Sequence, residues 1–122
     1  MDGALGQHVI ADFYGVDEDL LKDVTLLSDC LCTAAARCSL TPIGQPIIHV
    51  FPGDGLTGFL LLSESHIALH TYPEHQYIGV DLFSCGKEDS MPGMEVFRTQ
   101  LNPAREKITI VPRGDGLKPH TP

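Results

Sequence analysis

Reactive side chains are densest in residues 63–75, which read SESHIALHTYPEH, and Cys85 follows ten residues later. A serine beside histidines can supply a nucleophile and a base, several histidines can ligate a metal, and a cysteine can deliver a proton. If residues 67–72 form a strand, alternate side chains share one face. His66 and His70 then lie on the same surface, with a serine at its edge.

The residues alone leave three interpretations of this run open. A metal site would use His66, His70 and His75, but the HExxH pair is absent and no supporting carboxylate is evident. A serine hydrolase is disfavoured because the G-x-S-x-G elbow is missing. The third interpretation is a set of polar residues at a strand end. We predict no metal site. The spacing of these residues alone does not identify their function.

The surrounding sequence predicts the elements that must position these side chains. Alternating or continuous apolar runs predict strands over residues 7–14, 46–51, 58–62, 67–72, 77–83 and 107–111. Apolar residues at three- and four-residue spacing between residues 20 and 38 predict one helix or two joined helices, with Asp17 as N-cap, and a weaker helical pattern covers residues 94–101. The runs between residues 58 and 83 predict an antiparallel meander. We expect an α+β fold, a two-layer sandwich with helices packed on one face of an antiparallel sheet.

Size and composition predict one globular domain over residues 1–122, with 43% hydrophobic and 20% charged residues. The net charge of −8 argues against a nucleic-acid partner. No apolar run approaches the ~20 residues of a membrane span, and the first 15 residues do not resemble a signal peptide, so we expect a cytoplasmic protein without a membrane partner. The four cysteines, Cys30, Cys32, Cys38 and Cys85, form no CxxC pair and are expected to be thiols.

A resemblance identifies the site more closely. The stretch from Leu61 to Gly86, LLSESHIALHTYPEHQYIGVDLFSCG, resembles the core motif of the short prokaryotic S-adenosylmethionine decarboxylases, which are pyruvoyl enzymes. The similarity extends to GQHVIADFYG at residues 6–15, to the region of His49, Phe51 and Gly58, and to IVPRG at residues 110–114. It covers nearly the whole chain. The combination of ESH, HT-aromatic-PE and a cysteine-glycine pair at this distance is highly specific.

The resemblance implies that the chain cuts itself between Glu64 and Ser65. The Ser65 hydroxyl would attack the Glu64 carbonyl and convert the amide into an ester, which a base eliminates. The resulting dehydroalanine would hydrolyse to a pyruvoyl group, releasing ammonia. The products would be a β chain, residues 1–64, and an α chain, residues 65–122, with the pyruvoyl group as the covalent cofactor.

Three further residues match positions of the family that move protons. His70 matches the processing base, and a neutral imidazole suits that role near pH 7. Thr57 stands where many relatives have a serine that assists processing, and its hydroxyl retains that capacity. Cys85 matches the general acid that returns a proton to the substrate after carbon dioxide leaves. The pyruvoyl ketone condenses with the substrate amine and accepts the electron pair.

The family match also implies a binding site for the substrate. Glu74 matches the carboxylate expected to hold the ribose hydroxyls. Phe51 and Tyr72 match aromatics that flank the site, where a ring can stack on adenine or attract a sulfonium, although core packing is an equal alternative for both rings. The sequence departs from relatives at Tyr72, which is often tryptophan, and at Gln76, where glycine is common.

The implied function is decarboxylation of S-adenosylmethionine to the aminopropyl donor for spermidine synthesis, by a homodimer of αβ protomers with sites near the interface. Two alternatives stay open. One is a pyruvoyl-dependent arginine or ornithine decarboxylase, because the motif reports the cofactor rather than the pocket. The other is a non-catalytic homologue that acts as a regulatory partner, against which the intact Ser65, His70 and Cys85 argue.

Overall fold

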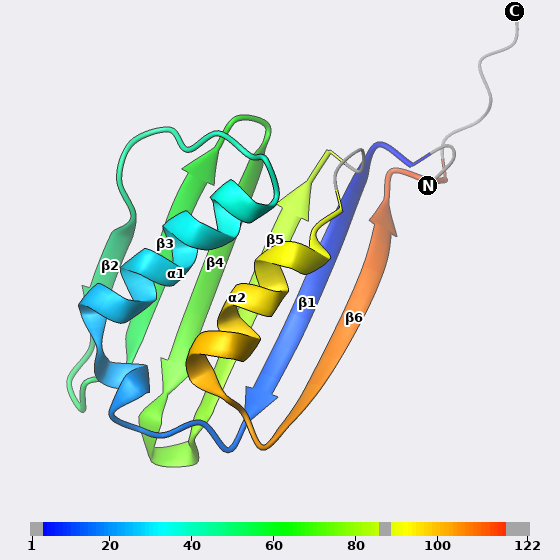
Figure 1. Cartoon of the computed structure of the whole chain (residues 1–122). Coiled ribbons are helices and arrows are strands. Elements are labelled where there is room, and N and C mark those ends of the chain that lie inside the picture. Colours follow the sequence, from blue (N-terminus) through cyan, green and yellow to red (C-terminus); the bar gives the residue numbers. More distant parts are fainter. Residues whose placement is uncertain (1–3, 86–88, 117–122) are drawn as a thin grey trace, which may run out of the picture.

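The computed structural model describes residues 4–85 and 89–116, so Gly86 of the quoted motif lies outside the described residues. Within these ranges the chain forms one six-stranded antiparallel sheet, and two α-helices cover one of its faces (Figure 1). No helix formed by the described residues lies on the opposite face. The predicted two-layer α+β sandwich is therefore confirmed. None of the described helices is long and apolar enough to cross a membrane.

The sheet has the spatial order β2-β3-β4-β5-β1-β6. Its strands are β1 (Gly6–Tyr14), β2 (Ile47–Val50), β3 (Leu56–Leu62), β4 (Ser65–Tyr72), β5 (Tyr77–Ser84) and β6 (Arg105–Arg113). The helices are α1 (Val24–Arg37) and α2 (Met91–Leu101), and two short 3-10 helices are η1 (Leu20–Lys22) and η2 (Pro73–His75). β3, β4 and β5 form the meander that the sequence predicts, and β2 extends it. β1, the first strand of the chain, lies inside the sheet between β5 and β6. β6, the last strand, forms one edge of the sheet.

The alternation of side chains in β4 decides which face each candidate residue occupies. Ile67 and Leu69 are fully buried beneath the helices. His66 and His70 point to the helix-free face, which we call the open face, because residues one apart on a strand point in opposite directions. The prediction that these two histidines share a surface is confirmed. Ser65 has the opposite parity and faces the helix layer, where it is buried.

Helix α1 begins at a different residue from the one predicted. Asp23, rather than Asp17, is its N-cap, and the Asp23 carboxylate accepts a hydrogen bond of 3.0 Å from the backbone N–H of Leu26. Asp17 instead closes a local turn by accepting from the Asp19 backbone N–H at 2.8 Å. Asp23 is extended, with φ −86° and ψ 97°, so it ends η1 and starts α1. The apolar residues therefore belong to two joined helices, η1 and α1, which is one of the two forms that the sequence predicts.

The two helices approach each other closely at Gly93. A Cβ atom at this position would lie 2.8 Å from the Cys38 sulfur and 3.3 Å from the Ala34 carbonyl oxygen, so only glycine fits without rearrangement. Cys30 of α1 and Cys38 at its C-terminal end are core residues, whereas Cys32 of α1 is exposed. Cys30 is buried, and this burial raises its pKa to about 11. The thiol is therefore protonated and inert at neutral pH.

Candidate active site

The β3–β4 connection contains the peptide bond that the sequence predicts to be cut. Ser63 and Glu64 form a two-residue hairpin loop, since Leu62 and Ser65 are paired across the strands. Glu64 has a φ of +64°, in the left-handed region that glycine prefers. A side chain held there costs about 1 kcal/mol or more. The strain lies in the residue that supplies the carbonyl of the predicted scissile bond.

Ser65 has an unusual environment for a serine. Its side chain is buried on the helix side of the sheet, and its Oγ is the one buried side-chain polar atom without a hydrogen-bond partner among the described residues. A buried hydroxyl without a partner costs about 1–3 kcal/mol. A simple hairpin needs neither this cost nor the strain at Glu64. Both are expected where the hydroxyl reacts with the carbonyl of the preceding residue.

Cys85 lies at the same end of the sheet as the Glu64–Ser65 bond. Antiparallel pairing of His66 with Phe83 brings the end of β5 beside the beginning of β4. Cys85 is a partly buried free thiol, and it lines a hollow of about 480 Å³ together with Glu64. Cys85 and Glu64, whose carbonyl belongs to the predicted scissile bond, therefore line one hollow. We call this region, with Glu64, Ser65 and Cys85, the cleavage end.

His70 and Thr57 meet at the opposite end of β4. The two residues are partners in the pairing of β3 with β4, and Thr57 Oγ1 lies 3.0 Å from His70 Nδ1. Both side chains are on the open face. Thr57 therefore places a hydroxyl beside His70, as its predicted role in processing requires. A hydrogen bond to Nδ1 fixes the orientation of the ring and leaves Nε2 for proton transfer.

The residues predicted to bind substrate surround this histidine. One hollow of about 400 Å³ is lined by His70, Thr57, Phe51 and Tyr72, and a neighbouring hollow of about 340 Å³ by Phe51, Tyr72 and Glu74. Phe51 and Tyr72 are 47% and 48% exposed, so neither ring is a core residue. The core-packing alternative is wrong for both. We call the region that contains these five residues the histidine end.

Sequence reasoning missed a third part of the histidine end. A hollow of about 650 Å³ beside His70 and Tyr72 is also lined by Asp12, Tyr14 and Tyr77. The Tyr77 hydroxyl donates a hydrogen bond of 2.5 Å to Asp12 Oδ1, and burial together with this bond raises the pKa of Tyr77. Asp12 and Tyr77 are far apart in sequence. They meet because β1 pairs with β5, and no local pattern predicts that pairing.

The structure does not bring His70 to Ser65 within one chain. The two residues are five positions apart on one strand, a separation of about 17 Å at the usual rise per residue. An odd separation also places their side chains on opposite faces. The predicted site is therefore divided between the cleavage end and the histidine end.

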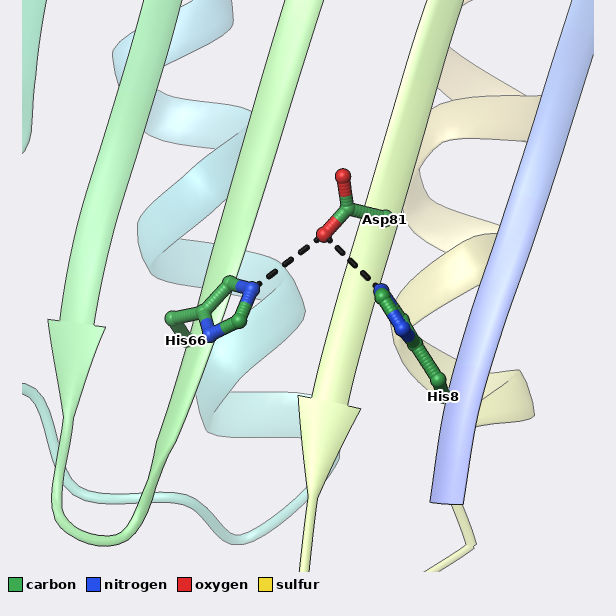
Figure 2. Close-up of side chains that lie close together, drawn as sticks. All are labelled: His8, His66 and Asp81. Atoms are coloured by element: carbon green, nitrogen blue, oxygen red, sulfur yellow. Dashed lines mark hydrogen bonds and ion pairs between the residues drawn. The ribbon is translucent and has the colours of Figure 1, made fainter. Parts of the chain in front are cut away.

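The three histidines considered as metal ligands do not converge either. His70 contacts Thr57, and His75 lies 4.0 Å from the Glu74 carboxylate in an exposed position. His66 instead lies with two residues that sequence reasoning did not select, His8 of β1 and Asp81 of β5 (Figure 2). The sequence could not indicate this group, because it too depends on the pairing of β1 with β5.

Comparison with known proteins identifies the family of this fold and site. The sequence profile of the S-adenosylmethionine decarboxylase family matches residues 7–114. The chain belongs to this family. Among curated members, the S-adenosylmethionine decarboxylase proenzyme of Sulfurihydrogenibium sp. (strain YO3AOP1) is 38% identical over 93% of this chain and 86% of the relative. The proenzyme of Aquifex aeolicus (strain VF5) is 39% identical over 93% of this chain and 84% of the relative.

Solved structures of the S-adenosylmethionine decarboxylase family agree with the fold. The crystal structure of the adenosylmethionine decarboxylase from Aquifex aeolicus VF5 superposes with a TM-score of 0.85 at 35% identity, and 98% of each chain is covered. The relatives are named proenzymes, which is the form that a self-cleaving chain takes before the cut. The predicted family resemblance is confirmed.

Proposed function

We propose that this S-adenosylmethionine decarboxylase is made as a proenzyme that cuts itself between Glu64 and Ser65 and then decarboxylates S-adenosylmethionine. The observation that carries the proposal is that the two residues of one peptide bond are both unusual: Glu64 has a strained backbone, and the Ser65 hydroxyl has no hydrogen-bond partner. Glu64 has a φ of +64°, and the next residue holds the Ser65 Oγ buried without a hydrogen bond. The family membership supports the same reaction.

The cut follows from the chemistry of these two residues. The Ser65 Oγ bonds to the Glu64 carbonyl carbon, the Glu64–Ser65 C–N bond breaks, and an ester replaces the amide. A base removes the Ser65 α proton and the Ser65 Cβ–Oγ bond breaks, which leaves a Glu64 carboxylate and a dehydroalanine at residue 65. Water then releases the Ser65 nitrogen as ammonia and leaves a pyruvoyl group at residue 65. That group supplies a ketone that withdraws electrons from the substrate α carbon.

The base is the His70 of a second copy. Within one chain His70 is about 17 Å from Ser65, so a complete site requires two chains. The open face suits such a pairing because it is uncovered and carries exposed apolar side chains, including Ile10, Ile47 and Leu61. Two sheets packed face to face about a twofold axis can place the histidine end of each chain over the cleavage end of its partner. The homodimer therefore has two composite sites.

The remaining residues bind the substrate and return its proton. Cys85 lines the same hollow as Glu64, where a thiol can protonate the substrate α carbon after carbon dioxide leaves. Glu74 presents an exposed carboxylate to the ribose hydroxyls. Phe51 and Tyr72 offer exposed ring faces to adenine or the sulfonium.

This arrangement favours S-adenosylmethionine over arginine or ornithine. A basic amino acid needs a carboxylate at the far end of its pocket, whereas the ring faces of Phe51 and Tyr72 border hollows of about 340–400 Å³ where adenine can stack. The free thiols suit a reducing compartment, so the enzyme is assigned to the cytoplasm.

The intact mass of freshly purified protein under denaturing conditions tests the proposal. We expect two chains, residues 1–64 and residues 65–122, with the second lighter than a serine-started peptide by one ammonia. The processed protein should release carbon dioxide from S-adenosylmethionine and not from arginine or ornithine. One uncut chain of 13.2 kDa without activity would instead indicate a non-catalytic homologue. Release from arginine or ornithine would overturn the assignment of the substrate.

A further inference from the structure

His66 is the first residue of β4 that is paired on both sides. Ser65 pairs only with Leu62 of β3, whereas His66 pairs with Leu61 of β3 and with Phe83 of β5. Under the proposed function, the cut makes residue 65 the first residue of the α chain and removes its covalent link to β3. Chain ends fray unless they are tied down. His66 is therefore the residue nearest to the reactive group that is paired with strands on both sides. The residue 65–66 amide joins the reactive group to it.

The His66 side chain is held by contacts that span three adjacent strands. Figure 2 shows His66 of β4 and His8 of β1 pointing at the same oxygen of Asp81 on β5. Each Nε2 atom lies 3.2 Å from Asp81 Oδ1. The His66 ring also stacks between Phe59 and Phe83, with centroid distances of 5.7 Å and 6.0 Å and interplanar angles of 22° and 7°. We call His8, His66 and Asp81 the clamp.

The hydrogen-bonding roles in the clamp follow from Arg113. Its Nη1 lies 3.3 Å from His8 Nδ1, and a guanidinium has donors but no acceptor. Nδ1 must therefore accept, so a neutral His8 carries its proton on Nε2 and donates it to Asp81. A divalent cation among the three residues would need the Nε2 lone pair and would stand close to the Arg113 charge. The arrangement is that of a hydrogen-bonded support rather than of a metal centre.

We propose that Asp81 and His8 are positioning residues that hold His66, and through it the reactive end of the α chain, after the Glu64–Ser65 bond is cut. This inference rests on the proposed function. Before the cut, the hairpin loop holds residue 65 in register with β3. After the cut, the clamp fixes the plane of the residue 65–66 amide. A shift of this end would misalign the proton that returns to the substrate carbon.

The experiment compares Asp81→Ala with the wild type and with Thr33→Ala, an exposed position on α1, which covers the face of the sheet opposite to the clamp. All three proteins should be fully cut. Asp81→Ala should then lose about tenfold or more in kcat, with KM changed by less than about twofold. It should also direct the returning proton to the residue 65 carbon instead of the substrate carbon in a larger fraction of turnovers. Hydrolysis of that imine leaves the substrate nitrogen on residue 65, as alanine, and releases the substrate carbons as an aldehyde, and the mass of the α chain reports the change. Thr33→Ala should match the wild type in all three measurements.

Hydrogen exchange separates positioning from a general loss of structure. In the cut proteins, Asp81→Ala should speed amide exchange at the start of β4. In the uncut Ser65→Ala background, the same substitution should change exchange there little, because the loop still holds the strand. Asp81→Asn keeps the size and one acceptor oxygen of the side chain, so its kcat should lie between those of the wild type and Asp81→Ala.

The proposal is wrong if cut Asp81→Ala retains the kcat and exchange of the wild type, or if exchange rises equally in the uncut background. It is also wrong if a chelator removes activity that Zn²⁺ then restores, because the clamp would be a metal site. These outcomes differ from failure of the proposed function. In that case the wild type itself would remain uncut or would not decarboxylate S-adenosylmethionine.

Discussion

Thr57 Oγ1 lies 3.0 Å from His70 Nδ1, so a hydroxyl on β3 orients the imidazole on β4. The residue that this imidazole is expected to serve, Ser65, begins the same strand about 17 Å away. Each chain thus holds a prepared base and a prepared nucleophile that do not meet. Under the proposed function, self-cleavage therefore requires two chains, because the base and the nucleophile of one chain do not meet.

Two inactive variants should therefore rescue each other. Ser65→Ala lacks the nucleophile, and His70→Ala lacks the base, so each expressed alone should stay uncut. In a mixed dimer the Ser65 of the His70→Ala chain faces an intact His70. Equal co-expression with random pairing should cut about half of the His70→Ala chains and none of the Ser65→Ala chains. Intact mass with differently tagged chains measures this, and cutting of His70→Ala alone would contradict a composite site.

Substitution of Thr57 should change the rate of processing more than the fold. Thr57→Val keeps the shape of the side chain but removes the hydroxyl that contacts His70. The loss of one neutral hydrogen bond should slow cutting by about 2- to 10-fold, the equivalent of about 0.5–1.5 kcal/mol. Thr57→Ser retains the hydroxyl and should cut at close to the rate of the wild type. The measurement is the fraction of cut chain against time after refolding. Equal rates for Thr57→Val and Thr57→Ser would exclude a role of the hydroxyl in processing.

Cys85→Ala should separate processing from turnover. The thiol opens onto the cavity beside Glu64 but is not needed for the attack by Ser65, so the chain should still be cut. Loss of a general acid should reduce decarboxylation by about 10²–10⁴-fold. Cys32→Ala, at an exposed cysteine of α1, is the matched control and should keep full activity. Unchanged turnover in Cys85→Ala would mean that another group delivers the proton.

The sequence predicted most of the elements because their signals are local. The strand of β4 and the shared face of His66 and His70 follow from a two-residue period. The start of α1 was misplaced because Asp17 and Asp23 are both suitable caps, and the extended backbone of Asp23 decides between them. Sequence also could not predict the insertion of β1 between β5 and β6.

The candidate site was predicted residue by residue from the family resemblance, but not as an arrangement. Counting along β4 from Ser65 to His70 already gives a long separation, yet the resemblance names both as parts of one site. The clamp and the pair of Asp12 with Tyr77 were missed for another reason. Both depend on long-range pairing of β1 with β5, which leaves no periodic signal.

Gln76 illustrates how the structure explains a departure from relatives. It follows η2 in a left-handed conformation, with φ 53° and ψ 37°, which suits the glycine that is common in relatives. Gln76→Gly should stabilise the fold by about 0.5–1 kcal/mol, whereas Gln76→Ala should not, because alanine keeps the strain. Denaturant midpoints in the uncut Ser65→Ala background, at one protein concentration, measure the difference. Equal midpoints for glycine and alanine would show that the conformation is not strained.

The contact between Arg98 of α2 and Glu106 of β6 makes the stability of the fold depend on pH in a definite direction. Arg98 donates hydrogen bonds of 2.6 Å and 2.5 Å to Glu106, and these bonds lower the pKa of the Glu106 carboxyl from 4.5. A lowered folded-state pKa stabilises the protein above the unfolded value, and that contribution is lost as pH falls through the folded value. Glu106→Gln should therefore cost about 0.5–1 kcal/mol at pH 7, a figure kept small by solvent screening.

The same Glu106→Gln variant should approach the stability of its parent as pH falls through the lowered folded-state pKa of Glu106, below which the carboxyl is protonated in both states. Urea midpoints measured stepwise from pH 7 into the acid range, in the Ser65→Ala background, follow the loss of this difference. Glu18→Gln, at an exposed glutamate before η1, is the control and should show a smaller difference at pH 7. A Glu106→Gln deficit that is constant over this range would mean that packing of the side chain, rather than its ion pair with Arg98, joins α2 to β6.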